Sequence, residues 1–281
     1  MSTARYINPY TDFGFKKLFG EEANKDLLVD FLNQLLPKKY LVKELSFRNV
    51  EKSGPIATER KAIFDLHCIS VDGERFIVEM QKAKIKYFKD RALFYTTFPI
   101  KEQAKKGKWD FKLDPIFYIA VLDFFYDEDE EKAKVKRDVN LKDQDCEVFF
   151  NKLNYVFLQM PAFKKEEHEL ETQYDKWLYF LKNLNDFNNI PDILKEPIFE
   201  KAFEIAEIAN LNTEDYKTYQ ESLLVYRDLV NAIKTRYDEG IEQGIEKVAI
   251  RCLKKGKSVE ETADITGLTI EQVEEIQSKM V

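Results

Sequence analysis

Hydrophobic and polar residues follow helical spacing in some parts of the chain and strand spacing in others. The stretch from Asn24, NKDLLVDFLNQLLP, repeats apolar residues at helical intervals until Pro37, which predicts an amphipathic helix. Residues 41–51 alternate between two faces and predict a strand. The run 114–125 is continuously apolar and rich in β-branched and aromatic residues, so it predicts a central strand covered on both faces.

Two further segments complete the expected pattern of the first half. Residues 86–107 predict a helix, interrupted near Pro99, with Phe88, Leu93 and Phe94 facing inward. Farther on, two short apolar stretches flank the turn-like sequence NKLN and predict a strand pair. These stretches are residues 146–150 and 155–160.

Beyond Pro161 the pattern becomes helical. Helices are expected at about 166–184, 192–210 and 213–255. In the last of these, Gly240 and Gly244 each cost about 1 kcal/mol relative to Ala, so either the helix frays there or another backbone approaches closely. The tail from Lys257 has the outline of a helix-turn-helix, with Ser258 and Thr269 as helix caps and Gly267 in the turn.

The stretch Lys61 to Lys86 is the most unusual part of the sequence. It predicts two strands joined at Asp72-Gly73, and it places Asp65 and Glu79 inside strands, where carboxylates are disfavoured. A half-buried carboxylate is costly unless it is paired, and a divalent cation is one such partner. The pair is therefore a candidate metal site.

The turn of this hairpin decides whether the two carboxylates share a face of the sheet. A two-residue turn at Asp72-Gly73 would place Asp65 and Glu79 on opposite faces. A three-residue turn, Val71-Asp72-Gly73, pairs Ser70 with Glu74 and Asp65 with Glu79. We therefore predict the longer turn, with Gly73 in the left-handed position of a bulge.

Composition limits the class of protein. The 281 residues are 44% hydrophobic, enough to bury a core, and the net charge is −7, so any nucleic-acid contact must rest on local patches. Three widely spaced cysteines, the lack of an apolar N-terminal leader and the lack of a membrane-length apolar run predict a soluble cytoplasmic protein.

Five motifs, in this order, resemble one known family. They are TDFGFKKLFG, FDLHC, IVEMQ, KDRALFY and YDEGIEQGIEK. The sequence resembles the Rpn family of recombination-promoting nucleases and putative transposases, within the PD-(D/E)XK nuclease superfamily. The resemblance implies an α/β fold with a mixed sheet, in which a restriction-endonuclease-like core is followed by a helical C-terminal region.

The resemblance also implies a domain arrangement and a function. Residues 1–162 would form the nuclease-like domain, 163–256 a helical region with a long helix, and 257–281 a small helix-turn-helix-like tail. The implied activity is that of a Mg²⁺-dependent DNA endonuclease, with Mn²⁺ or Ca²⁺ as substitutes, connected with recombination or transposition. The alternative is a non-catalytic module that keeps the nuclease fold and binds nucleic acid or protein.

The site residues implied by the resemblance lie on the hairpin. Asp65, Glu79 and the main-chain carbonyl of Met80 would hold the metal, and Asp65, Glu79 and Gln81 would form the catalytic set. Gln81 stands where the superfamily usually has Lys, and an amide cannot supply positive charge. A cation from Lys82, Lys84, Lys86 or Arg91 could replace it. The candidates for substrate binding are Asp12, Lys16, Lys82, Lys84, Arg91 and Tyr95.

Local charge agrees with a DNA partner. Between residues 82 and 112, ten basic residues and three acidic residues give a net charge of +7, in contrast to the acidic whole. Such a segment favours contacts to a phosphate backbone. Double-stranded DNA is therefore the expected partner, together with a second copy of the chain through the C-terminal helices.

Overall fold

The computed structural model describes residues 4–48, 51–52, 62–104, 110–127 and 130–280, with side-chain environments left aside for residues 51–52 and 62–63. By contacts the chain divides into two compact units, residues 1–223 and 224–281. Each unit is described by itself.

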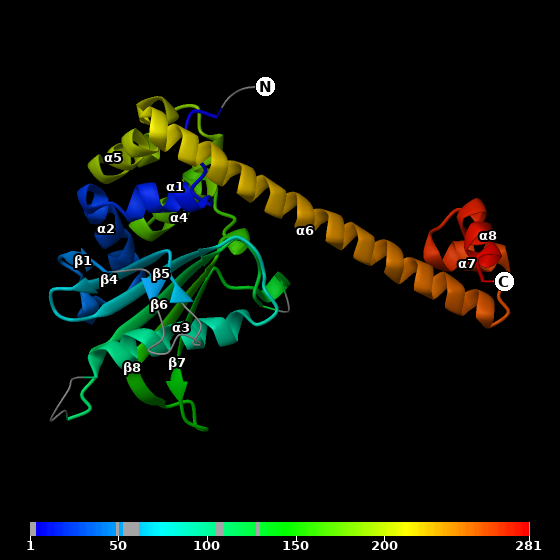
Figure 1. Ribbon diagram of the computed structural model, residues 1–281, viewed down its shortest axis with the longest axis horizontal. Helices are drawn as coiled ribbons and strands as arrows, with labels where there is room; N and C mark the ends of the chain where they lie inside the picture. Colours follow the sequence, from blue (N-terminus) through cyan, green and yellow to red (C-terminus); the bar gives the residue numbers. More distant parts are fainter. Residues whose placement is uncertain (1–3, 49–50, 53–61, 105–109, 128–129, 281) are drawn as a thin grey trace. The chain divides into compact units, whose positions relative to one another are not determined.

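A mixed sheet forms the centre of the first unit (Figure 1). Within the described residues it has six strands in the order β1-β4-β5-β6-β8-β7. The strands β5, β6 and β8 run parallel to one another, and the remaining neighbours are antiparallel. The strands are β1 (Leu45–Phe47), β4 (Leu66–Ser70), β5 (Arg75–Gln81), β6 (Ile116–Leu122), β7 (Lys136–Lys142) and β8 (Val148–Gln159), and a separate pair is formed by β2 (Glu51–Lys52) and β3 (Ala62–Ile63). The predicted α/β class with a mixed sheet is confirmed.

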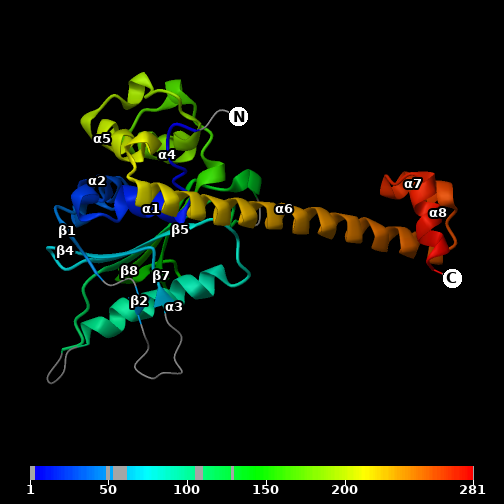
Figure 2. The same cartoon turned by 45° about the horizontal axis from the view of Figure 1, so that its top comes forward.

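Helices cover both faces of this sheet, as Figure 2 shows. One face carries α3 (Phe88–Gln103), and the other lies toward α1 (Asp12–Phe19) and α2 (Lys25–Leu35). The α2 helix and the fully buried β6 match their predictions. The helices α4 (Gln173–Asn183) and α5 (Pro197–Ala206) pack beside α1 and α2, with the Trp177 ring against those of Phe19 and Phe31. Residues 163–223 thus belong to the same compact unit as the sheet.

The hairpin of β4 and β5 has the predicted register. Ile69 lies opposite Arg75, and the Ser70 amide donates to the Glu74 carbonyl at 2.9 Å, which leaves Val71, Asp72 and Gly73 in the turn. Gly73 adopts a φ of +96°, a backbone conformation that glycine reaches at little cost. The register prediction and the left-handed Gly73 are therefore confirmed.

Asp65, in contrast, does not lie inside a strand as predicted. It occupies a bend one residue before β4 begins. Its Oδ2 atom accepts a hydrogen bond from the Met80 amide at 2.7 Å. The side chain thereby provides an acceptor for the Met80 amide beyond the point where the β4–β5 ladder has ended.

Three other predictions about strands and helices were wrong. The NKLN sequence lies within the continuous strand β8 instead of forming a turn, because the reversal occurs earlier, where the Asp143 amide donates to the Glu147 carbonyl. The α3 helix continues past Pro99 to Gln103. Leu93 and Phe94 are 55% and 43% exposed, because the helix turns a different side toward the sheet. The residues of α3 that are buried are Phe88, as predicted, and Ala92, Tyr95, Thr96, Pro99 and Gln103.

The second unit contains the C-terminal part of α6 (Thr213–Lys254) and two short helices, α7 (Val259–Thr266) and α8 (Ile270–Ser278). Ser258 and Thr269 cap α7 and α8 as predicted, and Gly267 ends α7 in the left-handed conformation. The α6 helix does not fray at Gly240 or Gly244, and within the described chain no atom lies within 4 Å of a Cβ built at either position. No helix in the described ranges is long and apolar enough to cross a membrane.

Candidate active site

The carboxylates of Asp65 and Glu79 meet where β4 begins and β5 ends. The backbone amide of Asp65 donates to Glu79 Oε1 at 3.3 Å, while Asp65 Oδ2 accepts from the amide of Met80. Glu79 is 1% exposed. The three-residue turn at Val71–Gly73 lies at the other end of the hairpin. It sets the register of the two strands and thereby places Asp65 beside Glu79.

The main-chain N–H and C=O groups of Met80 are directed toward Asp65. In an antiparallel ladder, the N–H and C=O groups of one residue point to the same neighbouring strand. The Met80 amide points to the β4 side, where it meets Asp65. Its carbonyl is therefore also directed to this side, beyond the end of β4.

Burial, and next to it a neighbouring negative charge, holds the pKa of both acids above its ordinary value; this charge is Asp65 for Glu79 and Asp12 for Asp65. Burial, followed by the charge of Asp65, raises the pKa of Glu79 to about 8. Burial also raises the pKa of Asp65, against the opposing effect of the hydrogen bond from the Met80 amide. Two such carboxylates are stable together in the ionised form when a cation lies between them.

The Arg91 guanidinium approaches the pair from α3. Its Nη2 atom lies 3.6 Å from Glu79 Oε2, and its Cζ atom lies 4.8 Å from the centre of the Tyr95 ring. Gln81 donates its side-chain amide to Glu79 Oε2 at 2.8 Å. Gln81 therefore fixes the orientation of the carboxylate, and Arg91 brings positive charge to it.

A cleft of about 440 Å³ opens beside Asp65. Asp12 and Lys16, which form an ion pair at 2.9 Å, line it from α1. The Lys82 ammonium is half-buried, and this burial lowers its pKa, whereas the charges of Asp12 and Asp65 act in the opposite direction. Lys84 is exposed. The structure thus gathers Asp12, Lys16 and Lys82 around Asp65.

Most lining residues of this cleft were not predicted, among them Arg48 and Thr218. Arg48 follows β1, and Thr218 comes from the first part of α6. Nothing near Thr218 in the sequence signals a contact with residues two hundred positions earlier. The start of α6 is fixed there by Tyr219, whose hydroxyl accepts from the Asn8 amide at 3.0 Å.

His67 lies on β4, close to Asp65 in the sequence, and is fully buried. Its ring meets that of Phe64 edge-on at 5.7 Å, and its Nε2 atom lies 4.0 Å from Glu102 Oε2. These contacts are those of a packed core residue.

The fold is thus an α/β protein whose mixed sheet brings two acidic residues together at neighbouring strand ends. A family model described as PD-(D/E)XK nuclease family transposase matches residues 9–236. The chain belongs to this family, and the resemblance noted in its motifs is confirmed. Comparison with curated proteins and with solved structures gave no match.

Nucleases of this class generally use divalent metal ions. Among the described residues, no group of three or more His, Cys, Asp and Glu side chains is placed to hold a metal. The donors that are present, two carboxylates and a main-chain carbonyl, suit a hard cation such as Mg²⁺, which keeps several of its waters and needs few protein ligands. The residues therefore fit the metal that the class uses.

Proposed function

We propose that this protein is a metal-dependent DNA endonuclease that hydrolyses phosphodiester bonds, in the setting of recombination or transposition. The observation that carries this proposal lies where β4 begins: the Glu79 carboxylate accepts from the Asp65 amide, the Asp65 carboxylate accepts from the next amide of β5, and Arg91 lies beside Glu79. Cleavage of plasmid DNA by the purified protein in Mg²⁺, and its loss in EDTA, tests the function directly.

Asp65, Glu79 and the carbonyl of Met80 would hold Mg²⁺, with Mn²⁺ or Ca²⁺ as substitutes. The bound metal would polarise the scissile phosphate and lower the pKa of an attacking water. The chain itself contributes the geometry. The Met80 amide fixes Asp65, and the Gln81 amide fixes Glu79, so both carboxylates are oriented before substrate arrives.

Arg91 supplies the positive charge that Gln81 cannot. The guanidinium is permanently charged, and its position over the Tyr95 ring restricts its movement. We infer that it contacts a phosphate oxygen next to the metal. Around it, Lys16, Lys82 and Lys84, together with other basic residues of the segment 82–112, would contact the backbone of double-stranded DNA. Lys105, Lys106 and Lys108 of this segment lie outside the described residues.

Replacing Arg91 with Gln should lower the rate of DNA cleavage by about 10- to 100-fold, because one charged contact to the reacting phosphate is lost. Arg91→Lys should retain part of the activity, since the charge remains while the planar geometry is lost. Initial rates of plasmid nicking measure the effect, and Lys38→Gln, which changes an exposed lysine after α2, is the control. Unchanged rates in Arg91→Gln would contradict the role of Arg91.

The substitution of Gln81 for the usual Lys favours a second candidate function. In it, the chain is a non-catalytic module that retains the fold and binds nucleic acid or protein. Binding of DNA without any cleavage, in Mg²⁺, Mn²⁺ or Ca²⁺, would favour this alternative over the nuclease.

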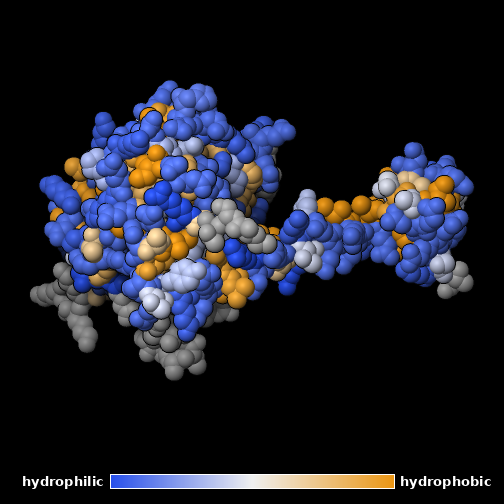
Figure 3. Space-filling view, turned by 90° about the horizontal axis from the view of Figure 1, so that it is seen from above, coloured by the Kyte–Doolittle hydropathy of each residue, from blue (hydrophilic) through white to orange (hydrophobic). Residues whose placement is uncertain are grey.

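We also propose that the chain self-associates through α6. An exposed apolar stripe runs along one side of this helix, as Figure 3 shows for its hydrophobic side chains. Its large members recur at intervals that keep them on one helical face, and Gly244 lies among them. These members are Val230, Ile233, Tyr237, Ile241 and Val248. The open space at Gly240 and Gly244 would allow the backbone of a second helix to approach.

A charge in this stripe should separate the copies. Tyr237→Asp in the full chain should reduce the molar mass measured by light scattering to that of a single chain. Thr235→Asp places the same charge on the opposite side of α6 and should leave the mass unchanged. Equal masses for wild type and Tyr237→Asp would exclude this interface.

A further inference from the structure

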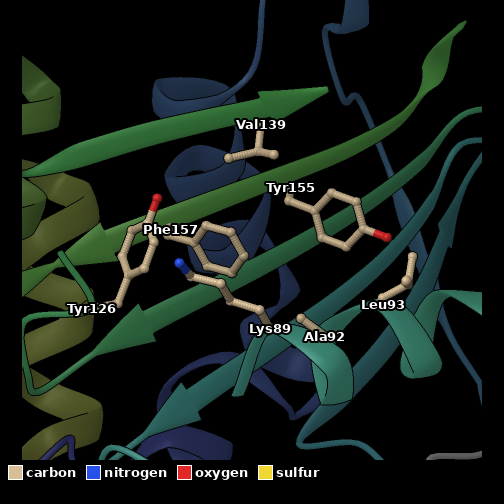
Figure 4. Close-up of a pocket in the computed structure, with 7 residues that line it drawn as sticks. All are labelled: Lys89, Ala92, Leu93, Tyr126, Val139, Tyr155 and Phe157. Atoms are coloured by element: carbon tan, nitrogen blue, oxygen red, sulfur yellow. The ribbon is translucent and has the colours of Figure 1, made fainter. Parts of the chain in front are cut away.

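A second pocket lies between α3 and the strands β7 and β8, on the other side of α3 from β4 (Figure 4). Its volume is about 290 Å³, at the lower end of small-ligand pockets, which are about 300–1,000 Å³. Its lining residues are Lys89, Ala92, Leu93, Tyr126, Val139, Tyr155 and Phe157.

Aromatic rings form much of this pocket. The centres of the Tyr126 and Phe157 rings are 5.3 Å apart, and the rings of Tyr155 and Phe157 lie nearly parallel, with an angle of 18° between their planes. The hydroxyl of Tyr155 is bonded to that of Thr96 at 2.9 Å, which fixes the ring. The pocket therefore presents flat, rigid apolar surfaces.

One cation belongs to the pocket. The Lys89 ammonium lies 5.1 Å from the centre of the Tyr126 ring, and in Figure 4 its side chain extends from α3 toward the aromatic rings. A ligand that fits has a flat, aromatic part and a negative charge close by. A nucleotide has both, because every base has a stacking face and every link carries a phosphate.

Phe157 of the pocket and Glu79 of the candidate active site lie at the same level across the sheet. Glu79 of β5 pairs with Ala120 of β6, and Ala120 pairs with Phe157 of β8. The backbones of Glu79 and Phe157 are thus two strand spacings apart, or about 10 Å. Both side chains project to the face covered by α3, which also carries Arg91 and Lys89. Phe88 of α3 packs in the same cluster as Ala120 and Phe157, so a strand that joins the two places would pass around the start of α3 and would need several nucleotides.

We propose that this pocket holds one unpaired base of the DNA strand whose phosphate lies at Asp65 and Glu79. The inference rests on the proposed nuclease function and adds a preference for DNA with an unpaired base near the cleavage point. The base would stack against Tyr126 and Phe157, and Lys89 would contact the adjoining phosphate. Because stacking is available to every base, this preference does not depend on sequence.

Apolar residues around the pocket are exposed, with Val139 40% and Leu93 55% accessible. An apolar side chain from a second copy of the chain could also fill the pocket. Lys89 favours the nucleotide, because a buried apolar contact between proteins gives no partner to an ammonium group. The same variants distinguish these two occupants.

Fluorescence anisotropy in EDTA measures DNA binding without cleavage. The probes are a blunt duplex, the same duplex with one bulged base, and that duplex with an abasic nucleotide in the bulge. Wild type should bind the bulged base about tenfold more tightly than the abasic bulge, as stacking of one base predicts. Tyr126→Leu removes a ring, and Val139→Trp fills the pocket, and both variants should lose this difference. Tyr126→Phe keeps the ring and should retain it.

Equal binding of the base and abasic bulges by wild type would overturn the proposal, as would a difference that persists in both Tyr126→Leu and Val139→Trp. A change of molar mass in these variants with unchanged DNA binding would also overturn it and would assign the pocket to self-association. If wild type cleaves DNA in Mg²⁺ but binds the base and abasic bulges equally, the base pocket is refuted and the nuclease function is retained. Failure of wild type both to bind the probes and to cleave DNA in Mg²⁺ would refute the nuclease function as well.

Discussion

Asp65→Asn should lower Mg²⁺-dependent DNA cleavage at least about 100-fold, while the protein remains folded. An Asn side chain has nearly the same shape, and its carbonyl oxygen can still accept the hydrogen bond from the Met80 amide. The variant therefore removes the charge proposed to bind the metal and little else. Stabilisation of a reacting phosphate by a metal is worth several kcal/mol, and each 1.36 kcal/mol changes the rate tenfold.

The matched control for this experiment is Asp72→Asn, which changes an exposed aspartate in the turn of the same hairpin and should leave the rate unchanged. Plasmid nicking across a Mg²⁺ titration gives both the rate and the apparent metal affinity. Equal nicking by wild type and Asp65→Asn would mean that the activity belongs to a contaminant or to a different site. Isothermal titration with Mn²⁺ should show weaker binding by Asp65→Asn than by Asp72→Asn.

Without metal, the protein should become less stable as the pH rises from about 5 to 8. Glu79 has a pKa of about 8 in the folded chain and an ordinary value of 4.5. Between these values the folded state holds a proton that the unfolded state has released. Stability therefore falls with rising pH, by up to roughly 1.4 kcal/mol per pH unit from this group, and levels off above pH 8. The raised pKa of Asp65 acts in the same direction.

Glu79→Gln should remove most of this pH dependence and make the metal-free protein more stable than wild type at pH 8, because no charge is then forced into the buried position. Mg²⁺ should stabilise wild type more at pH 8 than at pH 6, since the metal competes with the proton for Glu79. It should have little effect on Glu79→Gln at either pH.

Urea unfolding at several pH values, with EDTA or with Mg²⁺, measures these changes in the free energy of unfolding. Glu171→Gln, an exposed glutamate before α4, is the control and should follow wild type. A wild-type stability that stays constant or rises between pH 5 and 8 in EDTA would show that Glu79 is ionised in the folded protein, and the electrostatic description of the site would then be wrong.

Local signals in the sequence were sufficient for much of the fold. The periodicity of NKDLLVDFLNQLLP gave α2, and the apolar run from 114 gave the buried strand β6. Ser258, Gly267 and Thr269 gave the ends of α7 and α8, since caps act within one turn of a helix. The register of the β4–β5 hairpin could also be predicted, because side chains alternate with a period of two and the turn has few allowed lengths.

Other features depended on contacts between residues far apart in the chain. Leu93 and Phe94 are as apolar as the residues that α3 buries, so the sequence could not show which side of the helix would meet the sheet. Likewise, the packing of Trp177 against Phe19 and Phe31 joins the helices after residue 162 to the first unit, although the character of the sequence changes near Pro161.

The sequence by itself determined the two carboxylates of this protein, the register of their hairpin and the absence of a lysine at Gln81. Tertiary structure decided how they are used. It bends the chain at Asp65 so that the carboxylate accepts from Met80, and it brings Arg91 of α3 to within 3.6 Å of Glu79. The physical reason is that register is set by a turn within the hairpin, whereas the approach of a helix to a strand is set by the packing of the whole core.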